Sequence, residues 1–78
     1  MGQPLLEQLQ SLLKYELTPL QEWQTKSGEM GVYQSHGFCE LVIASSGLMV
    51  IRTYRSPESA LEDARIIAAF AHAQERES

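Results

Sequence analysis

The spacing of hydrophobic residues near the N-terminus predicts an amphipathic helix. Five leucines between positions 5 and 13 recur at three- and four-residue intervals, and polar residues fill the other side. We expect this helix to run from about Pro4 to Tyr15, because a proline suits a first helical turn. A free helix of this length is marginal in water, so the leucine stripe must pack against the rest of the chain.

Residues 18–29 give two conflicting signals. The spacing of Thr18 and Gln21, with Pro19 between them, has the form of a capping box and favours a short helix through Gln24. Residues 22–25 alternate instead as an edge strand does. We favour the helix, followed by a loop that Gly28 and Gly31 bracket.

From Val32 onward the hydrophobic period changes to two, which is typical of β-strands. The pattern predicts strands at Val32–Gln34, Phe38–Ala44 and Leu48–Arg55, separated by glycine-containing turns. Three consecutive strands with short turns form an antiparallel meander. A two-residue turn at Ser46 and Gly47 would pair Val42 with Ile51 across the second hairpin.

Both faces of this predicted sheet are apolar in their central rows, so both need cover. We assign the richer face to the helices of the same chain. It carries Cys39, Leu41, Ile43, Leu48 and Val50. We expect the other face to be completed by a partner, through Phe38, Val42, Met49 and Ile51.

The last helix has the clearest start signal, a Ser56 N-cap followed by a proline and an acidic residue. We expect it to span Pro57 to about Gln74 and to fray in the four residues that follow. Its apolar arc covers more than half of the circumference, which leaves Ile66 and Phe70 to be buried elsewhere. Asp63 projects within this arc and should have a basic or hydroxyl partner.

Together these elements predict a single α+β domain spanning residues 1–78. It consists of an N-terminal helix, a three-stranded antiparallel meander and a C-terminal helix, with both helices packed on one sheet face. So small a domain buries only about 60% of the surface of its unfolded chain. The one cysteine allows no internal disulfide. Self-association or a protein partner is therefore the expected source of further burial.

The net charge of −4 has the wrong sign for binding nucleic acid through its phosphates. The acidic excess is greatest in residues 56–78, where two arginines face five acidic residues. No apolar stretch is long enough to cross a membrane, and the first residues lack a charged leader and apolar core. We expect a soluble cytoplasmic protein that binds neither nucleic acid nor membranes.

Candidate chemistry is sparse. His36, Cys39 and His72 do not make a closed metal site, and strand alternation sends Cys39 toward the core. Glu62 and Asp63 point about 100° apart on a helix and do not converge on a substrate. Phosphate-binding and dinucleotide-binding motifs are absent from the sequence. We therefore expect no catalytic residues, metal site or cofactor.

The leading hypothesis is a non-catalytic protein-interaction module, a small adaptor or regulator that forms a homodimer or binds a larger protein. Its predicted interface consists of Phe38, Val42, Met49, Ile51, Ile66 and Phe70. A rival hypothesis is a small-molecule binder or enzyme with a pocket near Trp23, Tyr33 and Arg52, and with Arg52 or Arg55 as the anchor. A third is a small acidic inhibitor whose C-terminal segment blocks a basic site on another protein.

Overall fold

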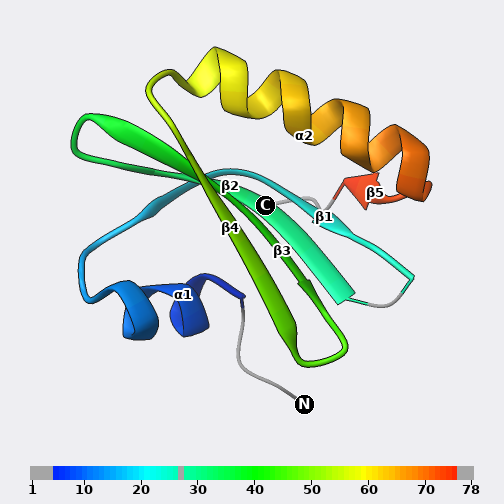
Figure 1. Ribbon diagram of the computed structural model, residues 1–78, viewed down its shortest axis with the longest axis horizontal. Coiled ribbons are helices and arrows are strands. Elements are labelled where there is room, and N and C mark those ends of the chain that lie inside the picture. The colour runs from blue at the N-terminus through cyan, green and yellow to red at the C-terminus, as the bar shows by residue number, and fades with distance from the viewer. Residues whose placement is uncertain (1–4, 27, 76–78) are drawn as a thin grey trace.

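Two helices and an antiparallel sheet make up the described part of this computed structural model, residues 5–26 and 28–75 (Figure 1). In chain order the elements are α1 (Leu5–Leu13), β1 (Thr18–Gln24), β2 (Gly28–Ser35), β3 (Phe38–Ser45), β4 (Leu48–Tyr54), α2 (Pro57–Ala71) and β5 (Gln74–Glu75). The strands lie side by side in the order β4-β3-β2-β1-β5. The first four strands therefore form a meander, and the short β5 adds to the outer edge of β1.

The helices cover opposite faces of the sheet, so the prediction that both pack on one face was wrong (Figure 1). On one face, three alanines of α2 pack against β2 and β3, with Trp23 of β1 in the same cluster. On the other face, Leu5 and Leu9 of α1 pack against Tyr33 and Val42. The cause is the doubly apolar sheet: each face needs its own cover, and α1 supplies the second one.

The prediction of three strands was also wrong, because residues 18–24 form β1 rather than a short helix. The alternation around Trp23 outweighs the local capping signal. As a strand residue, Trp23 is directed beneath α2 and is 2% exposed. A bulge leaves Leu20 without a partner on β2, next to Pro19.

Strand β2 begins at Gly28, four residues before the predicted start. A side chain at Gly28 would collide with the carbonyl of Ala44 on β3, and one at Gly31 would collide with the ring of Tyr33. These glycines allow close packing within a strand instead of marking a loop. The Tyr33 ring lies over Gly31, and its hydroxyl donates to Glu22 Oε2 at 2.7 Å.

The hairpin of β3 and β4 follows the predicted register, with Val42 opposite Ile51. Ser46 and Gly47 both have positive φ, at 50° and 84°, as a type I′ turn requires. At the start of α2, the Ser59 amide donates to Ser56 Oγ, which confirms the predicted N-cap.

The ends of the two predicted helices differ slightly from the structure. The helix α2 ends at Ala71, and His72 caps it in the left-handed conformation. The prediction of a helix as far as Gln74 was wrong, because Gln74 and Glu75 form β5. Helix α1 ends at Leu13, before the predicted end at Tyr15. The predicted start at Pro4 lies outside the described residues, as does the predicted fraying in residues 76–78.

The contact between Gly31 and Tyr33 gives a test of this packing. We expect Gly31→Ala to lower the free energy of unfolding by about 2 kcal/mol, because the added methyl group overpacks a rigid ring. Urea denaturation measures this change. In a Tyr33→Leu background the same substitution should cost much less, since the ring is gone. An equal cost in both backgrounds would contradict the proposed collision.

Candidate interaction surface

The six residues of the predicted partner interface divide between the interior and the surface. Val42 has no exposed area and packs beneath α1, while Phe38, Met49 and Ile51 on the same face are half-buried. Helix α1 of the same chain therefore covers much of the sheet face that was expected to bind a partner. The other part of the predicted interface is open, because Ile66 is 51% exposed and Phe70 is 85% exposed.

Two residues of β4 that were assigned to the core are also exposed. Leu48 is 74% exposed and Val50 is 54% exposed. Val50 lies opposite Ile43, a residue packed against the α2 cluster, so both β4 side chains point to the sheet face that α2 occupies. We call Leu48, Val50, Ile66 and Phe70 the β4–α2 surface.

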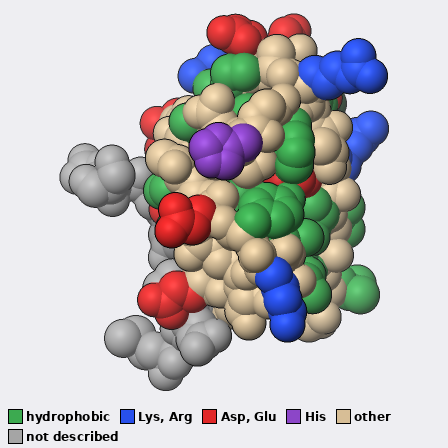
Figure 2. Space-filling model, turned by 90° about the vertical axis from the view of Figure 1, so that its left-hand side faces the viewer, with side chains coloured by type: hydrophobic (Ala, Val, Ile, Leu, Met, Phe, Trp, Pro, Cys, Tyr) green, Lys and Arg blue, Asp and Glu red, His purple; other side chains and the backbone are tan. Residues whose placement is uncertain are grey.

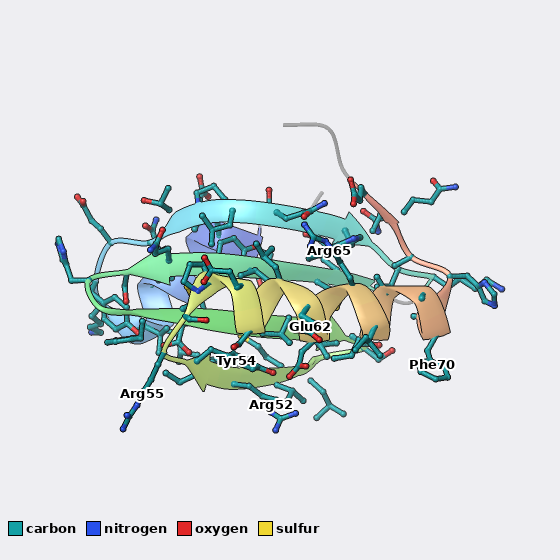
Figure 3. All side chains as sticks on the ribbon, turned by 90° about the horizontal axis from the view of Figure 1, so that it is seen from above. Arg52, Tyr54, Arg55, Glu62, Arg65 and Phe70 are labelled. Carbon is teal, nitrogen blue, oxygen red and sulfur yellow. The ribbon has the colours of Figure 1, made fainter. Side chains whose placement is uncertain are left out.

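The position of α2 explains why these side chains lack cover. Ala60, Ala64 and Ala68 are buried, and their small side chains let the helix lie close to the middle of the sheet. Figure 3 shows β4 to one side of α2, and Phe70 pointing toward that side, where Arg52 also lies. Arg65 points to the opposite side of the helix. The helix thus leaves Leu48 and Val50 of the outer strand exposed, while Tyr54 of the same strand packs against its cluster.

A hydrogen bond links α2 to β4 within this region. The Tyr54 hydroxyl donates to Asp63 Oδ2 at 2.7 Å, which confirms the predicted hydroxyl partner of Asp63. Burial raises the pKa of Tyr54, and the hydrogen bond and negative charge of Asp63 raise it further, while Arg52 opposes the shift. The bond fixes how the helix sits beside the edge strand.

Charged groups are distributed unevenly around the molecule. Figure 2 views the end of the sheet that lies at the left in Figure 1. Basic side chains stand at its upper right, at its upper left and near its lower centre, acidic ones mostly at its top and left, and hydrophobic ones between them. On β4 itself the basic residue is Arg52, and Arg55 follows the strand. The exposed apolar residues of β4 are therefore followed along the chain by positive charge.

A second polar cluster lies on the α1 face around Glu40, which is 3% exposed. Its Oε1 accepts from the Tyr15 hydroxyl at 3.0 Å and its Oε2 from Thr53 Oγ1 at 2.9 Å. Burial raises the pKa of Tyr15, with smaller contributions from the hydrogen bond and charge of Glu40. Both carboxylate oxygens are engaged, so the cluster joins the segment after α1 to β3 and β4.

Cys39 lies in the core, as strand alternation predicts. Burial raises the pKa of its thiol, and the charges of Glu58 and Glu40 raise it further, so the reactive thiolate is disfavoured. Residues 5–26 and 28–75 contain no group of three or more His, Cys, Asp or Glu side chains arranged to hold a metal ion.

The residues of the predicted small-molecule pocket do not come together. Trp23 is buried beneath α2, whereas Tyr33 is buried on the α1 face, so the sheet separates them. A hollow of about 250 Å³ lies elsewhere, beside Leu5 and the turn between β3 and β4. Its lining includes Leu48 and Met49, but none of the three predicted pocket residues.

Sequence reasoning missed Leu48 and Val50 as surface residues. Two signals could have found them: the last strand of a meander lies at a sheet edge, and an alanine-rich helix is too narrow to cover every strand. The prediction instead treated all apolar residues on the richer face as core.

Comparison with known protein families, with curated proteins and with solved structures finds no match for this chain. Neither helix in the described part of the chain has both the length and the apolar character needed to cross a membrane.

The raised pKa of Tyr54 predicts how stability depends on pH. The hydroxyl proton of Tyr54 is held more tightly in the folded state than in the unfolded state. The contribution of this group to the free energy of unfolding is therefore fully present below its ordinary pKa of 10.0 and is lost as the pH rises above that value. In urea titrations at about pH 9 to about pH 11, Tyr54→Phe should flatten part of this decline. At neutral pH it should cost about 1 kcal/mol through the lost hydrogen bond.

Tyr15→Phe is a parallel variant, because the pKa of Tyr15 is also raised. It should flatten a separate part of the decline and leave the Tyr54 contribution in place, so that the double variant flattens both parts. A Tyr54→Phe variant with an unchanged alkaline decline would contradict the assignment.

Proposed function

We propose that this chain is a non-catalytic protein-interaction module, an adaptor or regulator that acts in the cytoplasm and binds another protein chain through the β4–α2 surface. The observation that carries the proposal is the exposure of Phe70 and Leu48, at 85% and 74%. Large apolar side chains gathered on one side of a small protein are typical of interaction sites.

The composition of this surface supports the proposal. It combines an aromatic residue with three aliphatic ones, and Arg52 and Tyr54 adjoin it on the same strand. Phe, Tyr and Arg are enriched at protein interfaces relative to the rest of the surface. The surface also spans two elements that the Tyr54–Asp63 hydrogen bond holds together, so it is presented in a fixed shape.

The arrangement of the acidic residues favours binding over catalysis. Glu22, Glu40 and Asp63 each accept a hydrogen bond from a tyrosine hydroxyl of the same chain. These carboxylates therefore connect neighbouring elements of the fold. The three hydrogen bonds are separate, because each tyrosine hydroxyl binds a different one of these carboxylates. They therefore do not bring two of these carboxylates together as an acid–base pair.

A photo-crosslinking residue at position 70 tests the proposal, with position 65 as the matched control. Both positions are exposed on α2, but Arg65 points away from the β4 side. In cells that make the protein, position 70 should give a discrete product enlarged by one protein chain, whereas position 65 should not. Val50→Lys, within the same surface, should reduce the yield.

Equal product patterns from positions 70 and 65, or no discrete product from position 70, would contradict the proposal. Repeating the reaction in high salt distinguishes this proposal from the acidic-inhibitor hypothesis. A product that depends on apolar burial persists, whereas one that depends on exposed charges is lost.

A further inference from the structure

The two edges of the sheet differ in how well they are protected against pairing with another strand. Along β1, Pro19 removes a backbone donor, a bulge follows at Leu20, and β5 covers Trp23 and Gln24. Strand β4 has a neighbour on one side only within the described residues. Its seven residues contain neither a proline nor a bulge, and the first four are Leu, Met, Val and Ile.

The turn before β4 determines which of its backbone groups face outward. In a two-residue type I′ hairpin the closing pair, here Ser45 and Leu48, is hydrogen-bonded, and bonded pairs then alternate along the ladder. Residues 48, 50, 52 and 54 therefore bond to β3. The amide and carbonyl groups of Met49, Ile51 and Thr53 point away from the sheet.

We propose that the partner of the β4–α2 surface is a second copy of this chain, and that the two β4 strands pair antiparallel about a two-fold axis at Ile51. This inference rests on the proposed function. The axis places Ile51 opposite Ile51 of the second copy and Met49 opposite Thr53. In this register all outward amides and carbonyls of the three residues meet partners, which gives six hydrogen bonds.

Side chains also match in this register. On the α2 face, Val50 lies opposite Arg52 of the second copy, and Leu48 lies opposite Tyr54. No charged residue faces a like charge directly across the pair, and the residues nearest the axis are apolar. The exposed Phe70 ring of one copy approaches the Arg52–Tyr54 end of the other, where a guanidinium can stack on it.

The same geometry explains why a second copy is favoured over an unrelated strand. A two-fold interface uses the same patch twice, and β4 complements itself about its central residue. After pairing, the outer edges of the joined sheet are the two protected β1 edges, so assembly stops at two copies. An unpaired apolar edge would instead promote continued aggregation.

Light scattering after size exclusion tests the pairing with the full chain over a range of micromolar concentrations. The wild type should have twice the mass of an 8.8 kDa chain and dissociate on dilution. Val50→Lys should weaken association about 30-fold, because it sets two like-charge pairs against Arg52. The double variant Val50→Lys/Arg52→Glu should restore the dimer, since each lysine then faces a glutamate.

Leu20→Lys is the matched control, because it adds the same charge to an exposed leucine at the opposite edge. It should leave the mass unchanged. Circular dichroism verifies that each variant is folded. If Val50→Lys does not fold, amide hydrogen exchange in the wild type tests the pairing instead. Dilution should speed exchange at Met49, Ile51 and Thr53 at least tenfold, because their amides lose their partners when the dimer dissociates. Exchange at Val50 and Arg52 should not change.

Each other outcome overturns the inference. A wild type that is monomeric throughout refutes self-pairing, and a discrete crosslink from position 70 to another protein would then leave the proposed function standing. If the dimer affinity is unchanged by Val50→Lys, or if the three outward amides are not protected from exchange in the dimer, the two copies associate through a different surface. Failure of the double variant to recover refutes the register centred on Ile51.

Discussion

The structure depends on one constraint: its sheet is apolar on both faces, and the described chain has only two helices with which to cover them. A leucine stripe on α1 covers one face, and an alanine stripe on α2 covers the other. Because α2 lies close over the middle strands, the edge strand β4 keeps Leu48 and Val50 exposed. The candidate interaction surface is therefore a consequence of how the core is covered.

The polar groups reinforce this arrangement. Tyr54 and Asp63 connect α2 to β4, while Tyr15, Glu40 and Thr53 connect the segment after α1 to the opposite face of the same hairpin. Each connection pairs a carboxylate with hydroxyl groups, which satisfies a partly buried charge without a basic partner. The hairpin of β3 and β4 is thus held from both sides, and its outer edge is presented in a defined position.

The sequence predicted correctly those features that depend only on residues close together in the chain. The Ser56 cap and the β3–β4 register follow from neighbouring residues or from a two-residue turn. For Asp63 the cost of an unpaired carboxylate predicted a basic or hydroxyl partner, and the structure supplies the hydroxyl of Tyr54. For β1 the local signals conflicted: residues 22–25 alternate as a strand does, but the capping motif was preferred. The choice depends on the pairing with β2 and on the burial of Trp23, which are long-range effects. The placement of α1 on the second face likewise depends on the whole sheet. The exposure of Ile66 and Phe70 was predicted from the width of the apolar arc, whereas that of Leu48 and Val50 required knowing where α2 lies.

Solution X-ray scattering of the purified chain tests most directly whether a second copy covers the β4 edge. The single chain has a Cα radius of gyration of 11.5 Å. Two copies joined at β4, with centres about five strand spacings apart, should give about 17 Å and a doubled forward scattering. A radius near that of the single chain, with the mass of one chain at every concentration, would contradict the pairing.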